Sequence, residues 1–510
     1  ANLSRDYQSA SDRYFEALVR SPGDDDLADA AITAALDSGD ANRAHQIARM
    51  ARRDSSSAYV HLVRAVEAMS AQRWTEAHAE TTRVEGGGSE QLLGHMIATW
   101  ARTGDGHVDE VAPELQQLST VRPYGSLFGF EQAMAYDFAG RNTDALTAYA
   151  AAEQGGLWLP AGIERHADLL ARTRARADAE TLLRNGQNAT NPTLSAALAR
   201  LNAGSTPIVR PLTPQIGAAV GMYGLAAIYI QESDAPSGLA ALTLALMLDP
   251  QFDAARIAFA DAQGRIGHGD ASRAALRQIS DASPYAETAR VMTAWSLLDD
   301  DRNDEALAAA QANASQGGVR SKRALADMYR RLQRYSDAEP LYSELITADA
   351  DDWRLYFSRG VARERLNRWP DAEADFQHAL QLSPDQADVL NYLGYMWVDR
   401  GEHMQEGLAM IQRAVEINPT SGAVIDSLAW AYFKMGDLNQ AVEYSERAVQ
   451  LDAADATLND HLGDIYWRLN RHTEARFQWQ RALALGPDDA AAVQAKIDHG
   501  LAPAPRAAHR

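Results

Sequence analysis

The sequence contains no cysteine among its 510 residues. This absence excludes disulfide bonds, thiolate nucleophiles, zinc–thiolate sites and iron–sulfur clusters. It is typical of proteins that work in an oxidising compartment, where a stray thiol is a liability. The chain also begins at Ala1 rather than at methionine, so we expect that a leading segment, foremost an export signal, has been removed. A lipid anchor would then require a cysteine upstream of Ala1.

Basic side chains are in the minority. The 48 Lys and Arg residues face 69 Asp and Glu residues, and the net charge is −21. Because such a chain repels a polyphosphate, we expect no general binding of nucleic acid. Long apolar runs are also missing. The longest one, Gly217–Ile230, is too short and too rich in glycine and alanine to cross a bilayer, so we expect no transmembrane segment.

The motifs of common catalytic and phosphate-binding sites are absent as well. There is no H-E-x-x-H, G-x-S-x-G or G-x-x-x-x-G-K-[ST] pattern, and the glycines of Glu85–Glu90 and Gly264–Asp270 fall between expected helices. One cluster, His461, Asp464 and His472, invites a metal or catalytic interpretation. His461 and Asp464 are three residues apart on one expected helix, which supplies only half a metal site, while His472 falls in a turn. We therefore expect no metal, no cofactor and no catalytic residue.

What the chain does contain is a repeat. Alanine is abundant and β-branched runs are scarce, which favours helices. Small residues recur every 34 or 35 positions, at Ala326, Gly360, Gly394, Ala429 and Gly463. Each is followed by an aromatic residue, a turn and a second helix with small and aromatic residues in register, as at Ala372, Phe376 and Ala379 or Ala475, Trp479 and Ala482, and several units end in proline, at Pro384, Pro419 and Pro487.

This spacing places one apolar stripe on each of two antiparallel helices. A single hairpin of this kind cannot bury its own apolar face, so neighbouring hairpins must stack. The units resemble the tetratricopeptide repeat, and fainter units extend towards the N-terminus, about thirteen hairpins in all with the first incomplete. We therefore predict an all-α fold, a tetratricopeptide-type α-solenoid in which hairpins form a right-handed superhelix.

Three prolines interrupt the pattern between residues 202 and 215. This break predicts a loop or linker. We accordingly predict a degenerate N-terminal helical array over 1–201, a linker over 202–215, and a regular C-terminal array over 216–488. Residues 489–510 are expected to hold the end of a helix and a disordered tail.

In the repeat frame, one set of side chains from each first helix points to the inner, concave face. Aromatic rings beside hydrogen-bonding groups suit a bound peptide or a partner's loop, although they could equally pad neighbouring repeats. The predicted partner-binding residues are Asn391, Tyr395, Asp399, Asp426, Trp430, Phe433, Lys434, Asp460, Asp464, Trp467 and Arg468, with Val398 in the same set of positions.

Two repeats earlier, the same positions of the first helices hold arginines. Arginines held on rigid helices can bind a carboxylate or phosphate with two hydrogen bonds. The alternative is that these arginines pair with Asp327, Asp349, Asp351 and Asp352 and only balance the local charge. The anion-binding candidates are Arg320, Arg323, Arg330, Arg331, Arg354 and Arg365.

Residues Pro214–Pro487 resemble a narrower family of exported proteobacterial tetratricopeptide proteins, through stretches such as IDSLAWAYF and IGAAVGMYGLAAIYIQ. That family is similar to an outer-membrane lipoprotein adaptor of a periplasmic carboxyl-terminal processing protease, which brings cell-wall hydrolases to the protease for degradation. The resemblance implies a periplasmic protein, anchored or not, that binds a protein partner and has no catalytic residues of its own.

Three functions remain open from the sequence. The first is a non-enzymatic periplasmic adaptor whose concave face binds a protease or an envelope hydrolase. The second is a scaffold for exopolysaccharide export or outer-membrane protein assembly, in which sugars would stack on Trp430 and Trp467. The third is an enzyme with its chemistry hidden between repeats, which predicts converging titratable groups. The sequence leaves the oligomeric state open.

Overall fold

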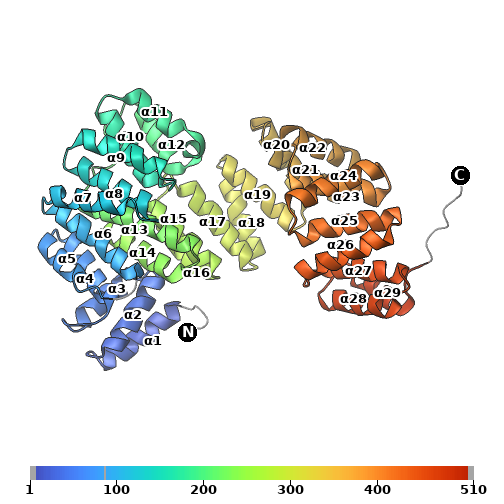
Figure 1. Ribbon diagram of the computed structural model, residues 1–510, viewed down its shortest axis with the longest axis horizontal. Helices are drawn as coiled ribbons and strands as arrows, with labels where there is room; N and C mark the ends of the chain where they lie inside the picture. Colours follow the sequence, from blue (N-terminus) through green and yellow to red (C-terminus); the bar gives the residue numbers. More distant parts are fainter. Residues whose placement is uncertain (1–6, 86–87, 317, 503–510) are drawn as a thin grey trace. The chain divides into compact units, whose positions relative to one another are not determined.

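The structure is a computed structural model that describes residues 7–85, 88–316 and 318–502 (Figure 1). Over these residues the chain forms 29 α-helices and one 3-10 helix, and no strand. The predicted all-α repeat fold is therefore confirmed. The chain divides into two compact units, unit 1 over residues 1–321 and unit 2 over residues 322–510. The predicted disordered tail lies largely in residues 503–510, outside the described residues.

The helices of unit 1 are α1 (Tyr7–Arg20), α2 (Asp25–Asp37), α3 (Ala41–Met50), α4 (Ala58–Ser70), α5 (Trp74–Thr81), α6 (Gly88–Gly104), α7 (Val108–Leu118), α8 (Gly125–Phe138), α9 (Asn142–Gln154), α10 (Pro160–Arg172), α11 (Arg176–Arg184), η2 (Gly186–Thr190), α12 (Pro192–Asn202), α13 (Pro214–Gln231), α14 (Ala235–Leu248), α15 (Asp253–Arg265), α16 (Gly269–Leu276), α17 (Ala286–Asp299) and α18 (Asn303–Ala314). Helix α19 (Val319–Arg331) crosses the boundary.

The helices of unit 2 are α20 (Tyr335–Ala348), α21 (Trp353–Arg365), α22 (Trp369–Leu382), α23 (Ala387–Arg400), α24 (Met404–Ile417), α25 (Gly422–Met435), α26 (Leu438–Leu451), α27 (Ala456–Arg468), α28 (His472–Ala484) and α29 (Ala490–His499). Four hairpins, α21–α22, α23–α24, α25–α26 and α27–α28, follow one another in register (Figure 1).

Small residues hold each hairpin together, as the repeat predicts. A Cβ atom added at Gly360 would lie 2.6 Å from the ring of Phe376, and one at Gly463 would lie 2.4 Å from the ring of Trp479. Only glycine lets these helices approach so closely. The buried apolar residues of unit 2 form small clusters shared by neighbouring helices, such as Ile425, Ala448 and Leu458 on α25, α26 and α27.

Unit 1 is built differently, because α13 and α14 lie against helices far away in the sequence. These two helices contact α2, α4 and α6, and α13 also contacts α8 (Figure 1). Helix α13 is apolar on all sides, which requires burial on all sides. Its glycines admit large neighbours: a Cβ at Gly217 would lie 2.2 Å from the ring of Trp100, and one at Gly224 would lie 2.4 Å from Leu127.

The proline-rich break is a structured loop inside unit 1. Of the predicted linker 202–215, residues 203–213 lie outside helices, whereas Asn202 ends α12 and Pro214 and Gln215 begin α13. Ile208 in this loop is fully buried, and its N–H donates to Asp168 Oδ1 over 2.7 Å. Along the sequence, the division into compact units falls between Ser321 and Lys322 and not at 202–215, because α13 and α14 pack with the N-terminal helices.

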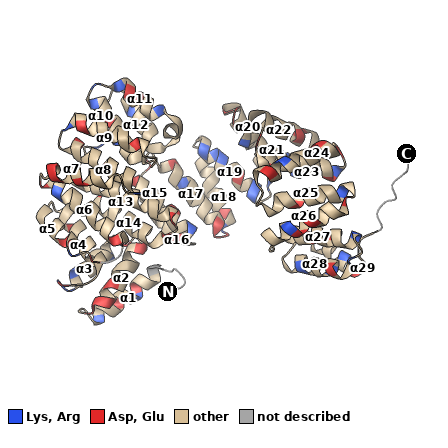
Figure 2. Cartoon of the chain, viewed as in Figure 1, with Lys and Arg blue, Asp and Glu red and all other residues tan. Residues whose placement is uncertain are grey.

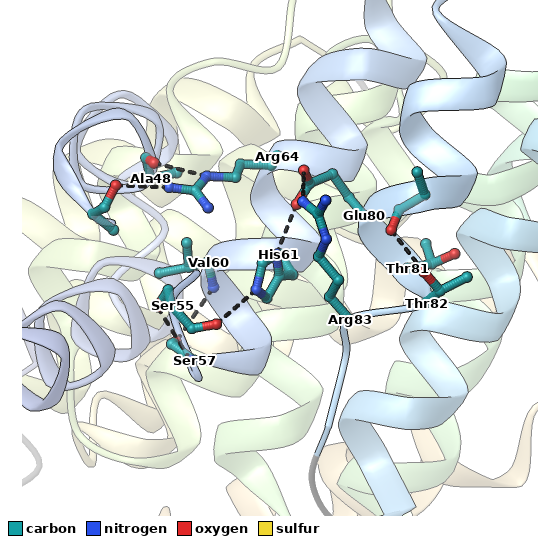
Figure 3. A network of polar contacts seen from close by, with 12 residues as sticks. Ala48, Ser55, Ser57, Val60, His61, Arg64, Glu80, Thr81, Thr82 and Arg83 are labelled. Carbon is teal, nitrogen blue, oxygen red and sulfur yellow. Dashed lines mark hydrogen bonds and ion pairs between the residues drawn. The ribbon is translucent and has the colours of Figure 1, made fainter. Parts of the chain in front are cut away.

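A buried polar network ties the first hairpins of unit 1 together (Figure 3). The ring of His61 on α4 lies between Glu80 Oε2, 2.7 Å from Nδ1, and the carbonyl oxygen of Ser55, 2.8 Å from Nε2. Arg83 donates to the other oxygen of Glu80 over 2.9 Å. The network joins α4 to α5 and to the turn before α4, and it pairs each buried polar group as burial requires.

Candidate partner-binding groove

Unit 2 contains a hollow of about 630 Å³, called the groove below. It is lined by the first helices of four consecutive repeats, α21, α23, α25 and α27, together with Trp369 of α22. The repeat frame predicts this arrangement, because equivalent positions on successive first helices face the same side. Five of the residues predicted from sequence line it together: Asn391, Tyr395, Asp399, Asp426 and Arg365.

His461 lies at one end of the groove and is held by the chain's own side chains. Its Nδ1 lies 2.6 Å from Asp426 Oδ2, and its ring stacks on Trp430 with 4.1 Å between centroids. Burial lowers the pKa of His461, but the carboxylates of Asp426, Asp464 and Asp460 outweigh burial and raise it above its ordinary value. His461 is therefore half of an ion pair that joins α25 to α27.

Trp430 is the centre of an aromatic and charged contact between α23 and α25. Its second neighbour ring is Phe433, 4.9 Å away, and its Nε1–H donates to Asp399 over 3.2 Å. Lys434 donates to the same carboxylate over 3.1 Å. These predicted residues thus pack against one another beside the groove, which matches the padding alternative for Trp430, Phe433 and Lys434.

The predicted residues of the last repeat lie against α29. Lys496 of α29 donates to Asp460 over 2.7 Å and to Asp464 over 2.9 Å. Trp479 donates to Asp464 as well, and burial raises the pKa of Asp464 although Lys496 opposes that shift. A Cβ at Gly500 would overlap the ring of Trp467, so the C-terminal end of α29 covers this ring, while Arg468 is half-buried beside it.

The cluster that invited a metal interpretation does not converge. His461 pairs with Asp426, Asp464 pairs with Lys496, and His472 stacks on Trp467 with 4.1 Å between centroids. Within the described residues, no group of three or more potential ligands of these types gathers around one point. The three side chains serve packing and charge pairing.

Three acceptor atoms of the groove receive no hydrogen bond from the described chain. They are Glu364 Oε2, Asn391 Oδ1 and Asp426 Oδ1, and each is inaccessible to solvent. Burial raises the pKa of Glu364 above its ordinary value, and burial likewise raises the pKa of Tyr395. Sequence reasoning missed Glu364, although it occupies the repeat position that Val398 occupies one unit later.

The predicted anion-binding arginines are dispersed, and several have acidic partners. Arg323 donates to Asp352 over 2.8 Å, and Arg354 lies 3.8 Å from the same carboxylate. Arg330 lies 3.9 Å from Asp327. Figure 2 shows the basic residues along α19, which include Arg320, Arg323, Arg330 and Arg331, while Arg365 is in the groove. The pairs with Asp327 and Asp352 are those of the charge-balance alternative, and anion binding stays a prediction.

Sequence reasoning also missed a pocket of about 430 Å³ in unit 1. The loop of residues 203–213 folds over α10 and α12 to form it, and burial raises the pKa of Glu164 in its wall to about 7. Arg200 donates to Glu164 over 3.2 Å. No local sequence pattern indicates this pocket, because its walls come from segments that meet only in the folded unit.

The comparisons with known proteins agree with the repeat assignment. The tetratricopeptide-repeat family model matches residues 323–387, 362–421 and 427–490. The matched segments between residues 323 and 490 therefore have the pattern of tetratricopeptide repeats, a class of stacked helical hairpins.

Among curated proteins, a tetratricopeptide repeat-containing protein of Pseudomonas aeruginosa is 32% identical over 114 residues, which are 22% of this chain and 19% of that protein. Anaphase-promoting complex subunit 3 of Schizosaccharomyces pombe is 22% identical over 166 residues, 32% of this chain and 25% of that protein. The chain thus matches about a fifth to a quarter of the length of these relatives.

Among solved structures, a chain of the Cut9–Hcn1 hetero-tetramer of the APC/C aligns with 98% of this chain and 95% of its own length, at 14% identity and a TM-score of 0.45. The repeat assignment rests on the family match and on the hairpins themselves. No helix in the described part of the chain is both long and apolar enough to cross a membrane.

Proposed function

We propose that the chain is a non-enzymatic adaptor that binds an extended segment of a protein partner in the groove of unit 2. The observation that carries the proposal is the groove itself, a hollow continuous over four repeats with tyrosine, carboxylate and amide side chains in its walls. A rigid, partly apolar groove with a few polar groups binds an extended chain at a low entropic cost.

The proposal includes a periplasmic location and a partner of a stated kind, a carboxyl-terminal processing protease or a cell-envelope hydrolase that such a protease degrades. Two observations support this part. The chain has no cysteine, and residues Pro214–Pro487 resemble the exported adaptor family. Fractionation of cells that make the full protein checks the location, and recovery of the chain with the cytoplasmic fraction alone would contradict it.

A glycan-export scaffold is less consistent with the packing of the two tryptophans. Sugars would need open ring faces, whereas Trp430 stacks with His461 and Phe433 and Trp467 stacks with His472. We therefore keep a protein partner as the proposed ligand.

Photocrosslinking tests the proposal directly. Benzoylphenylalanine would replace Tyr395 in the groove or, as a matched control, Phe477, which is 62% exposed on α28 and lies outside the groove. In cells, we expect protein crosslinks from position 395 and none of the same mass from position 477. Crosslinks from position 477 alone, or none from either position, would contradict binding in the groove.

A further inference from the structure

Unit 1 contains a hollow of about 680 Å³ that is separate from the groove of unit 2. It is bounded by the first half of α6, by the turn between α7 and α8, and by the C-terminal end of α13, and it is termed the α6–α13 hollow. Two of its lining residues are buried rings, Phe128 of α8 and Tyr229 of α13. These helices come together only because α13 packs against α6 and α8.

The rim of the α6–α13 hollow is apolar and open to solvent. Val121, in the turn before α8, is 46% exposed, and Leu92, Leu118 and Tyr124 are half-buried around the same hollow. The turn is structured, since the N–H of Val121 donates to the carbonyl oxygen of Leu118 over 2.9 Å. Apolar side chains around a preformed hollow are the arrangement of a docking surface.

The charge beside this rim is negative only. Glu232, the C-cap of α13, and Asp234, the N-cap of α14, line the hollow, and no lysine or arginine is among the described residues that line it. Neither carboxylate forms an ion pair within the described part of the chain, and Glu232 is exposed. Burial raises the pKa of Tyr229, and Asp234 and Glu232 add to this increase, so the charge of both acids acts on the hollow.

The nearest bases of the chain do not neutralise these acids. His95 lines the hollow, but burial lowers its pKa below the ordinary value, so it is largely uncharged at neutral pH. Its ring packs edge-on against Phe128, with 5.8 Å between centroids. Arg122 belongs to the same turn as Val121 but lines a different hollow. The negative charge is therefore available to a cation that a ligand brings.

We propose that the α6–α13 hollow is a second docking site, which binds a segment of a protein partner that carries a large apolar side chain beside a lysine or an arginine. The apolar side chain enters the hollow past Val121, and the cation stays at the rim on the side of Glu232. Apolar burial supplies affinity, and charge complementarity selects a basic segment. The inference goes beyond the proposed function, because this site belongs to unit 1 and does not depend on the groove.

Photocrosslinking on the purified full chain tests the site. Benzoylphenylalanine replaces Val121 or, as the matched control, Val19, a valine of α1 that is 53% exposed and does not line the hollow. The probes are three pools of acetylated, amidated nonapeptides with uncharged random flanks. Their two central residues are leucine and lysine, leucine and glutamate, or serine and lysine.

We expect position 121 to crosslink the leucine–lysine pool about tenfold more than the leucine–glutamate pool, because like charges repel at the rim. It should also exceed the serine–lysine pool, because serine has little apolar surface to bury. From position 19 the three pools should give equal, weak crosslinks. Mass spectrometry quantifies the crosslinked peptides.

Two charge reversals locate the preference for a basic segment. In the chain that carries the crosslinker at position 121, Glu232→Lys should lower crosslinking of the leucine–lysine pool about tenfold. Asp178→Lys is the matched control, because it changes the net charge equally at an exposed acid of α11 that does not line the hollow. Circular dichroism verifies that both variants are folded.

The outcomes separate a docking site from general attraction to an acidic chain. Equal crosslinking of the leucine–lysine and serine–lysine pools, or of the leucine–lysine and leucine–glutamate pools, would overturn the proposal. So would crosslinks of equal strength from positions 121 and 19, none from position 121, or equal losses in Glu232→Lys and Asp178→Lys. None of these results bears on the groove, which is tested by crosslinks from position 395.

Discussion

At the scale of single residues, two buried acids in unit 1 stand out. Glu131 on α8 is fully buried, and it accepts a hydrogen bond from the indole of Trp100 while its Oε1 has no partner. Burial raises the pKa of Glu131 to about 8. Burial, with a contribution from Asp234, raises the pKa of Asp37 to about 8 as well. Both groups are thus largely protonated in the folded chain at neutral pH.

These pKa values predict how the stability of unit 1 depends on pH. The folded-state pKa of Glu131 lies above its ordinary value of 4.5, so the folded chain binds more protons than the unfolded chain between these values. The contribution of Glu131 to the free energy of unfolding must therefore fall as pH rises from about 5 to 8. Glu131→Gln should weaken this dependence and stabilise unit 1 by about 4 kcal/mol at pH 8. Urea unfolding at several pH values measures the pH dependence of the free energy of unfolding and the stabilisation caused by the substitution.

The matched control for this experiment is Glu110→Gln. Glu110 belongs to α7 of the same unit, and its side chain is 64% exposed. We expect its pH profile to run parallel to that of the unchanged protein. A parallel profile for Glu131→Gln as well would mean that Glu131 is ionised in the folded chain.

At the scale of elements, α13 shows how composition sets the place of a helix. Its 18 residues have no polar face, so it can only lie inside the unit. Its glycines allow neighbouring side chains to reach its backbone, as Trp100 does at Gly217. The same glycines lower the helix propensity, and tertiary packing offsets that cost.

Gly217→Ala should therefore destabilise unit 1. The added methyl group would lie 2.2 Å from the ring of Trp100, and we expect a loss of about 1–3 kcal/mol from overpacking. Gly264→Ala in α15 is the matched control, because the nearest atom to its added Cβ is 3.8 Å away. That change should be neutral or slightly stabilising. Urea unfolding compares the two, and equal effects would contradict the packing of α13 against α6.

Helix α29 protects the last repeat of unit 2. Lys496 supplies the positive charge that Asp460 and Asp464 share, and Asp464 is 6% exposed. Lys496→Met keeps most of the stem but leaves a buried carboxylate without its cation, and we expect a loss of about 1–3 kcal/mol.

A double-mutant cycle checks that the loss comes from this pair. In the Asp464→Asn background, the loss caused by Lys496→Met in thermal or urea unfolding should shrink, because the buried charge is gone. If the two losses simply add, α29 is held by other contacts.

At the scale of the whole molecule, the two units differ in the range of their contacts. Most of the buried apolar residues of unit 1 belong to one cluster that runs from Leu18 to Ala289. Those of unit 2 form small clusters between neighbouring helices. Unit 2 is thus stabilised repeat by repeat, whereas unit 1 depends on α13 and α14.

This difference predicts the behaviour of fragments. Residues 318–510 should fold by themselves, with a helical circular dichroism spectrum and a cooperative thermal transition. Residues 1–201 should not, because they lack α13 and α14 and expose the apolar faces of α2, α4, α6 and α8. Residues 1–316 serve as the control that restores these two helices. A cooperative transition for residues 1–201 would contradict the role of α13 and α14 in this unit.

The sequence by itself determined the helical hairpins and their register. Gly360, Gly394 and Gly463 mark the crossings because close helix contact leaves room for nothing larger, and this requirement is local and periodic. The repeat period also places Asn391, Tyr395 and Asp426 on one face, because equivalent positions of successive repeats point the same way.

Contacts between segments that are distant in the sequence could not be predicted from the repeat, and only the tertiary structure decides them. The packing of α13 against α6, the cover that α29 provides over Asp464, and the burial of Ile208 in the proline-rich loop all join residues without a shared period. The unsatisfied acceptors of the groove belong here as well, because whether Asp426 finds a donor depends on every side chain around it. Periodicity reports which face a residue occupies, and the neighbours on that face depend on how the chain folds back on itself.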